Sequence, residues 1–273
     1  MRLMSASLVT VLSVAHLAFA APPPCKAPED VAGIVAPLPD LRTSFRRGAT
    51  LNVLAVGSAT VFGPEASLAR GTVTNQALSH PASDQPVAAL PQGSAGTPSQ
   101  YAFPLQMARA LEAAVPGLTV SVTVRGGRGM SASDMVPLIH SEFAAHHYQL
   151  LLWQTGTVEA VRNISPGDFA STLMDGVDTA RSAGADVVLV DSQFSRFLEA
   201  NTDIDRYKEA LQQVAITPGV ALFHRFDLMR AWASDGQLDL ERTSPAEREH
   251  AIERLHACLG ESLARMVLAG ANS

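Results

Sequence analysis

The sequence predicts an α/β protein built on a five-stranded parallel sheet with helices on both faces. Five short runs rich in Val and Leu alternate along the chain with longer segments in which apolar residues recur at helical spacing. Most of these runs are continuously apolar, which is typical of strands that are buried on both faces. Because strands that alternate with helices pair in parallel, the expected architecture is a three-layer α/β/α sandwich of the flavodoxin-like kind.

The predicted elements follow one another in a single domain over residues 51–273. The expected strands are residues 51–56, 120–124, 149–153, 186–191 and 220–226. The expected helices are residues 101–114, 133–145, 166–183, 203–215 and 245–268. Ser165 followed by Pro166 has the pattern of a helix N-cap with proline in the first turn. Ligands bind beyond the carboxyl ends of parallel strands, so we expect functional residues directly after each strand.

The N-terminal part of the chain is predicted to be a processing signal and a tail. Arg2, an apolar run over residues 3–18 and a small-x-small motif ending at Ala20 predict a signal peptide over residues 1–20. A membrane anchor is the other interpretation, but polar residues interrupt the run. The Pro-rich residues 21–50 are expected to form an extended tail. The protein is therefore expected to be exported, to the periplasm or the extracellular space.

Composition excludes some classes of partner. The chain has 273 residues, of which 47% are hydrophobic, and a net charge of −6, so it supports a large core but favours no nucleic-acid partner. No segment after the signal peptide is apolar enough to span a membrane. Residues 65–100 are rich in Ser, Thr, Pro and Gly and form a predicted flexible insertion. This insertion is either a lid over the strand ends or a solvent loop without a role.

The chain contains two cysteines, Cys25 and Cys258. In an exported protein an even number of cysteines suggests a disulfide. This one would join the tail to the last helix, and closing so long a loop would be worth about 4 kcal/mol in the chain-entropy model. Two unpaired cysteines are the alternative.

Small and polar residues follow the first three predicted strands. Gly57-Ser58 follows the first, a glycine-rich segment over residues 126–129 follows the second, and Gln154 begins a polar segment after the third. Backbone N–H groups of glycines can bind a phosphate or an oxyanion, but residues 126–129 lack the spacing of a phosphate-binding loop. No Cys/His set has metal-ligand spacing, and the adjacent His146 and His147 would point apart on a helix. No metal or other cofactor is predicted.

Four segments fall at the expected strand ends and near the last helix: LAVGSATVFG, VRGGRGMSASDM, LLWQTGTVEAVRN and EREHAIERLHACLG. In this order they resemble the blocks of the SGNH hydrolase family, the GDSL-type esterases and lipases. The resemblance covers about residues 51–268 and is closest to a secreted bacterial branch. It implies a three-layer α/β/α fold. It also implies hydrolysis of carboxyl esters by a serine that a histidine and an acid activate.

The first and third blocks depart from the family pattern. Counted without a gap, the family's nucleophilic serine falls on Ala59, and Ser58 stands one residue earlier. The oxyanion-hole asparagine falls on Val158, which cannot donate a side-chain hydrogen bond, and the Asp that follows falls on Glu159. Ser58 would serve as the nucleophile if the turn after the first strand were one residue shorter than usual. Otherwise Ser58 is a turn or capping residue.

The resemblance also implies the remaining site residues. His250 falls on the catalytic histidine, and Glu247 falls on the aspartate that orients it. Gly126 or Gly129 can fill the role of the second block's glycine. Together with a backbone N–H at Thr157, these glycines complete the expected oxyanion hole.

The C-terminal residues also permit a structural interpretation. Ser244 and Glu247 have capping-box spacing, so Glu247 could cap the last helix rather than orient a histidine. If the helix begins there, His250 faces solvent, whereas catalysis needs it on a loop or first turn that faces the strand ends. His256 is expected in or near the core, and His224 is expected to be a structural residue of the fifth strand.

Two functions from different classes follow. The first is an exported hydrolase of a small ester, an acylated glycan or a lipid, with Ser58, His250 and Glu247 as its triad. The second is a catalytically inactive protein of the same fold that binds a glycan or a protein partner. A nucleotide-binding flavodoxin-like protein, using residues 126–129, is a more distant third. The sequence predicts no oligomeric state.

Overall fold

The computed structural model describes residues 25–26, 28, 36–45, 49–63 and 98–273. Within these residues the strands form one parallel sheet with the order β2-β1-β3-β4-β5. The strands are β1 (Thr50–Gly57), β2 (Thr119–Gly126), β3 (Leu150–Gln154), β4 (Asp186–Val190) and β5 (Val220–Phe223). The predicted signal peptide, half of the predicted tail and most of the predicted insertion lie outside the described residues.

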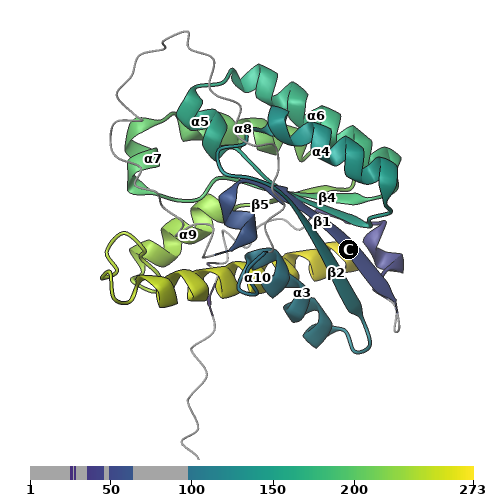
Figure 1. Ribbon diagram of the computed structural model, residues 1–273, viewed down its shortest axis with the longest axis horizontal. Coiled ribbons are helices and arrows are strands. Elements are labelled where there is room, and N and C mark those ends of the chain that lie inside the picture. The colour runs from purple at the N-terminus through teal and green to yellow at the C-terminus, as the bar shows by residue number, and fades with distance from the viewer. Residues whose placement is uncertain (1–24, 27, 29–35, 46–48, 64–97) are drawn as a thin grey trace, which may run out of the picture.

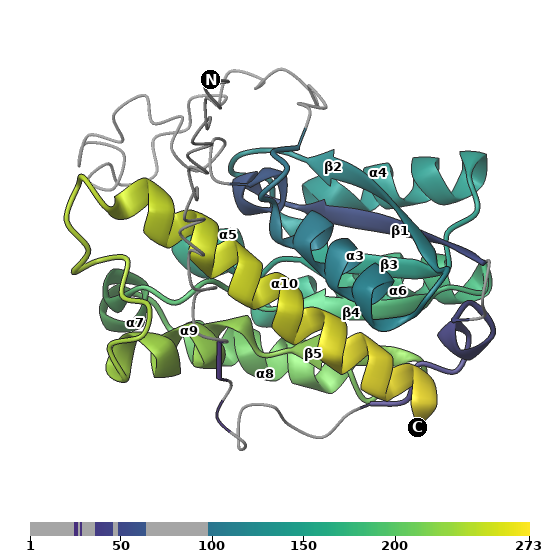
Figure 2. The same ribbon diagram turned by 90° about the horizontal axis from the view of Figure 1, so that it is seen from below.

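Helices cover both faces of the sheet. They are α3 (Phe103–Ala114), α4 (Ala132–Ala145), α5 (Thr157–Arg162), α6 (Pro166–Ser182), α7 (Arg196–Asn201), α8 (Ile204–Val214), α9 (Arg225–Ser234) and α10 (Arg248–Asn272), with two 3₁₀ turns, η1 (Leu41–Thr43) and η2 (Ala59–Phe62). The pair α4 and α6 lies on one side of the sheet, and α3 and α10 lie on the other (Figure 1). Seen from below, α10 runs diagonally beside α3, with α3 between it and β2 (Figure 2). The predicted three-layer fold is confirmed.

The apolar strands fill two cores, one on each face. Val53 and Ala55 of β1 belong to the core beneath α3 and α10, while Leu54 and Val56 belong to the core beneath α4 and α6. Successive side chains of a strand point to opposite faces, so a strand buried on both faces must be apolar at every position. This requirement is why the continuous runs in the sequence predicted the sheet correctly.

The fifth predicted strand was too long. Residues 220–226 were predicted to form one strand, but β5 ends at Phe223 and Arg225 begins α9. Phe226, Met229 and Ala233 recur at helical spacing and are buried, and this periodicity favours a helix over a strand. The short helices α5 and α7 were not predicted, since six residues are too few to display a helical period.

The last helix begins three residues later than predicted. Ser244 and Glu247 form a turn directly before the helix, in which Glu247 N donates to Ser244 O at 3.1 Å and Ser244 Oγ donates to Glu247 Oε2 at 2.8 Å. Glu247 is the N-cap residue of α10, and its carbonyl oxygen accepts from Ala251 N at 2.9 Å. Helix α10 starts at Arg248, after this turn. The turn satisfies its own polar groups, so the helix begins beyond it. Among the described residues, none of the helices combines the length and the apolar character that crossing a membrane requires.

The predicted disulfide between Cys25 and Cys258 is present, with a Cα–Cα distance of 5.4 Å. It fixes the segment around Cys25 against α10. Next to it, the indole Nε1 of Trp232 in α9 donates to the carbonyl oxygen of Lys26 at 2.8 Å. The N-terminal segment is therefore attached to two helices of the same layer.

Candidate active site

Ser58 lies at the carboxyl end of β1, where the chain leaves the sheet. Gly57 ends the strand, and Ser58 has an extended backbone (φ −79°, ψ −166°) before η2 begins at Ala59. The Ser58 side chain is half-buried and makes no capping hydrogen bond to η2. Its Oγ instead accepts a hydrogen bond from Gln154 Nε2 at 3.3 Å. The hydroxyl is therefore turned toward the end of β3, the central strand of the sheet.

A chain of polar side chains connects Ser58 to a buried arginine. Gln154 is almost fully buried, and its Oε1 accepts from Thr60 Oγ1 at 2.7 Å. Thr60 Oγ1 in turn accepts from Arg225 Nη1 at 3.3 Å. Arg225 is 2% exposed, and its Cζ atom lies 5.7 Å from the centroid of the Phe103 ring. Burial lowers the pKa of Arg225 to about 10, so the side chain stays cationic at neutral pH.

Neither Gln154 nor Arg225 was assigned a role by sequence reasoning. Gln154 had a signal, because it is the polar residue that ends a fully buried strand. No sequence pattern indicated a role for Arg225, because this residue lay inside a segment that was predicted to be a strand. Its contact with Thr60 spans 165 positions of sequence, which no local pattern can reveal.

The predicted oxyanion-hole residues line the neighbouring strand ends. Gly126 ends β2 opposite Gly57 and has φ 126°, and Gly129 has φ 73° in the turn before α4. L side chains rarely adopt these angles, so glycine is favoured at both positions. Thr157 opens α5, where its buried Oγ1 hydrogen-bonds no described residue, and Val158 follows on the same turn.

Glu159 has a structural role. The side chain is 1% exposed, and its Oε2 accepts from Gly156 N at 2.8 Å. Its other oxygen accepts from the backbone N–H of Ala132, at the start of α4. The carboxylate therefore joins the turn after β3 to the N-terminus of α4.

The predicted histidine and acid do not contact Ser58 in this structure. His250 lies in the first turn of α10, where its side chain is 92% exposed and Nδ1 is 3.6 Å from Glu253 Oε2. Glu247 contacts Ser244 instead of His250. Among the described residues, no histidine hydrogen-bonds Ser58. The three-residue triad therefore stays a prediction.

His256 lies in the core, as expected. It is 2% exposed, and its Nδ1 accepts from the backbone N–H of Phe103 at 3.1 Å. Burial, together with the nearby Arg225, lowers the pKa of His256 to about 3. The ring is therefore neutral at physiological pH and fixes the start of α3 against α10.

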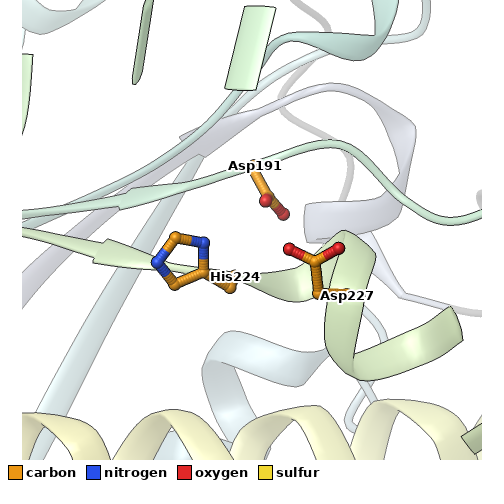
Figure 3. Close-up of side chains that lie close together, drawn as sticks. All are labelled: Asp191, His224 and Asp227. Atoms are coloured by element: carbon orange, nitrogen blue, oxygen red, sulfur yellow. The ribbon is translucent and has the colours of Figure 1, made fainter. Parts of the chain in front are cut away.

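Three other ionisable side chains gather at the carboxyl ends of β4 and β5. Asp191 follows β4, His224 follows β5 and Asp227 lies in the first turn of α9; one atom of each lies within 4.8 Å of the others (Figure 3). Burial raises the pKa of Asp191 to about 7 and lowers that of His224. Of the described residues, these three have the donor set of a metal site. They lie on separate elements, so no sequence motif indicated them.

Comparisons with known proteins place the chain in a family. A family model described as the non-GDSL lipase-like family matches residues 24–273. No protein of curated function matches the sequence. Among solved structures, the fold is similar to TesA, with 16% identity, a TM-score of 0.54 and coverage of 80% of this chain and 99% of that one.

Other similar structures carry esterase or lipolytic descriptions. One is a catalytic mutant of Axe2, an acetylxylan esterase from Geobacillus stearothermophilus, with 15% identity, a TM-score of 0.51 and coverage of 81% of this chain and 94% of that one. Another is a putative lipolytic protein of the G-D-S-L family from Desulfitobacterium hafniense DCB-2, with 13% identity, a TM-score of 0.51 and coverage of 79% and 98%. At such identities the similarity to these structures establishes only the fold. The match to the family model over residues 24–273 establishes that the chain belongs to the family. The chain belongs to the non-GDSL lipase-like family and has the fold of the SGNH hydrolases.

Proposed function

We propose that the protein is an exported hydrolase of carboxyl esters, with Ser58 as its nucleophile. The observation that carries the proposal is the contact between Ser58 Oγ and Gln154 Nε2 at 3.3 Å. It places a hydroxyl that is not used for capping at the carboxyl end of the sheet, beside a side-chain amide donor. Family membership and the esterase descriptions of similar structures support the same reaction class.

The proposed reaction proceeds through an acyl-enzyme. Ser58 Oγ attacks the ester carbonyl carbon while its proton passes to His250, which Glu247 orients. The tetrahedral oxyanion then collapses, the C–O bond to the alcohol breaks, and the alcohol takes the proton from His250. Water, deprotonated by His250, next attacks the acyl carbon on Ser58. The bond between Ser58 Oγ and this carbon then breaks, His250 returns its proton to Ser58 Oγ, and the carboxylic acid is released.

Gln154 compensates for the valine that stands where the family has an asparagine. Val158 cannot donate a side-chain hydrogen bond. Gln154 Nε2 donates to Ser58 Oγ in the described conformation, and we propose that it turns to the carbonyl oxygen of the ester when substrate binds. Backbone N–H groups at Gly126, Gly129 and Thr157 are the other proposed donors to the oxyanion. One such donor contributes roughly 10²–10³ to kcat in enzymes of this kind.

The mechanism requires His250 to reach Ser58. In the described conformation the imidazole is exposed and faces Glu253. Its first-turn position allows residues 248–250 to unwind without breaking the buried part of α10, which begins at Ile252. We therefore propose that substrate binding stabilises a conformation in which this turn faces the strand ends.

Hydrolysis of p-nitrophenyl acetate by the purified chain tests the assignment. Ser58→Ala should lower kcat/KM by on the order of 10⁶, which is the cost of removing the nucleophile of a triad. The matched control is Ser171→Ala, which removes an exposed hydroxyl on α6 and should leave the rate unchanged. If Ser58→Ala retains the parent rate, Ser58 is not the nucleophile.

Two further variants separate the proposed roles of histidine and amide. His250→Ala should abolish turnover, whereas His140→Ala, at another exposed histidine, should not. Gln154→Leu keeps the size of the side chain but removes the amide, and it should lower kcat by roughly 10²–10³. Parent-like kcat in Gln154→Leu would remove Gln154 from the oxyanion hole while leaving Ser58 in place.

The proposed substrates are a small ester, an acylated glycan or a lipid. Export is a part of the proposal that can be tested separately, since cleavage after Ala20 would leave Ala21 as the first residue of the mature chain. N-terminal sequencing of protein from the periplasm or medium measures this. A chain with no hydrolysis of any ester would instead support the second hypothesis, an inactive protein that binds a glycan or a protein partner.

A further inference from the structure

The cluster formed by Asp191, His224 and Asp227 lies outside the proposed ester-hydrolysing site. Ser58 directly follows β1, whereas the cluster lies at the carboxyl ends of β4 and β5, and β3 separates β1 from β4 in the sheet. Figure 3 shows the two carboxyl groups facing each other, with one ring nitrogen of His224 turned toward them. Ligand atoms from all three residues lie within 4.8 Å of one another.

Asp191 has an oxygen that nothing in its surroundings satisfies. The side chain is fully buried, and Oδ1 accepts from the backbone N–H of Phe226 at 2.7 Å. Oδ2 is also buried and hydrogen-bonds none of the described residues. Buried polar atoms are normally paired, and an unpaired carboxylate oxygen is especially costly. An orphan oxygen in a cluster of ligand groups indicates a missing partner.

His224 and Asp227 both have atoms available for such a partner. Neither ring nitrogen of His224 hydrogen-bonds any described residue, and the imidazole is half-buried. Asp227 Oδ1 is engaged by Lys208 Nζ and by Arg230 Nη2, each at 2.9 Å. The second carboxylate oxygen, Oδ2, has no described hydrogen bond. Two carboxylate oxygens and one imidazole nitrogen are a donor set of transition-metal sites.

We propose that Asp191, His224 and Asp227 bind a divalent transition-metal ion of the Zn²⁺ type. An ion at the centre of three atoms that are 4.8 Å apart at most lies roughly 2.8 Å from each, so side-chain shifts of under about 1 Å reach zinc–ligand distances. The ion would join the ends of β4 and β5 to the first turn of α9. It would also neutralise the buried carboxylate of Asp191.

Neighbouring cations set the expected affinity. Lys208 and Arg230 form ion pairs with Asp227. The buried Arg225 lies close enough to Asp191 for its positive charge to lower the pKa of that carboxyl group. These positive charges repel a divalent ion and weaken its binding. We therefore expect a dissociation constant on the order of micromolar, weaker than that of structural zinc sites.

Isothermal titration of the untagged, metal-free chain with ZnCl₂ near neutral pH tests the site, with the disulfide intact. One ion per chain should bind, and Asp191→Asn, which keeps the acceptor for Phe226 N, should weaken binding by about tenfold or more. His224→Gln should do the same. It changes a half-buried side chain, so it keeps the test decisive if the Asp191 variant fails to fold.

The Lys208→Met variant distinguishes binding at this cluster from adventitious binding of zinc elsewhere on the surface, because Lys208 lies against Asp227. It removes the ammonium group but keeps an apolar side chain against Phe226, over which Lys208 Nζ lies at 5.0 Å. Zinc binding should tighten by about threefold or more, because a repelling charge is gone. The matched control is Asp205→Asn, which removes an exposed carboxylate 3.8 Å from the same lysine and should leave zinc affinity nearly unchanged.

Two results would overturn the site. One is the absence of binding by the parent chain at up to about 100 µM zinc. The other is a parent-like affinity in both the Asp191→Asn and the His224→Gln variants, which would mean that zinc binds elsewhere. Neither result bears on Ser58, so the ester-hydrolase proposal is tested independently.

Discussion

Asp186 is a buried carboxylate at the start of β4. It is completely buried, with Oδ2 accepting from Leu41 N at 2.9 Å and Oδ1 pairing with Arg181 Nη1 at 2.7 Å. Burial raises its pKa to about 6 in spite of these partners. The folded protein therefore binds this proton more tightly than the unfolded chain, in which an aspartate has a pKa of about 3.9.

The raised pKa of Asp186 predicts how stability depends on pH. Its contribution is fully present below about pH 4 and is lost as the pH rises through about 6. In Asp186→Asn this contribution cannot titrate. The free energy of unfolding of the parent minus that of Asp186→Asn should therefore fall between pH 4 and pH 7 when measured by urea denaturation. A difference that grows over this interval would contradict the assignment.

At the scale of elements, α10 approaches α3 closely at Gly260. A Cβ there would lie 2.7 Å from the backbone nitrogen of Met107, which is closer than side-chain carbons normally approach. Alanine favours a helix over glycine by about 1 kcal/mol, whereas overpacking a core costs about 1–3 kcal/mol. The packing cost should exceed the gain in helix propensity, because the Cβ would meet backbone atoms of α3, which cannot move aside as a side chain can.

Gly260→Ala should therefore lower the free energy of unfolding by about 1–2 kcal/mol. Gly167→Ala is the matched control, since that glycine is exposed in α6 and a Cβ would meet only Ser165 Oγ at an ordinary 3.8 Å. It should raise stability by about 0.5 kcal/mol. Denaturant unfolding of both variants measures the two signs, and two changes of the same sign would contradict this account of the α3–α10 contact.

At the scale of the whole molecule, the disulfide closes a loop that contains nearly the entire domain. Cys25 and Cys258 are 233 positions apart. The double variant Cys25→Ser/Cys258→Ser should lose about 2–5 kcal/mol of unfolding free energy, as removal of a native disulfide usually does. The parent should show the same loss in reducing buffer, and the double variant should not respond to reductant. A variant as stable as the oxidised parent would show that the bond does not stabilise the fold.

The sheet could be predicted from the sequence because its cause is local. A strand buried on both faces must be apolar at each position, and Val187 to Val190 satisfy this within four residues. The same logic failed after Phe223, where the predicted strand was extended across His224 and Arg225 to include Phe226, which belongs to α9. The layers could also be predicted, because strands that alternate with helices leave few possible topologies.

The candidate site could be predicted only in part. Ser58 and Gly126 were located because they follow strands and because their blocks resemble those of a family. The partners of Ser58 were not, since Gln154 and Arg225 meet Thr60 through contacts between distant segments. His250 lies in the first turn of α10 and faces solvent, as the capping-box interpretation of Ser244 and Glu247 predicted.

Labelling with a fluorophosphonate probe tests the central claim most directly. Such a probe reacts with an activated serine hydroxyl and leaves a covalent phosphonate that peptide mass spectrometry locates. The account predicts a single adduct on the peptide that contains Ser58, with no labelling of the Ser58→Ala variant. A chain that stays unlabelled, or that carries the label on another serine while Ser58 is unmodified, would contradict the assignment of Ser58 as the nucleophile.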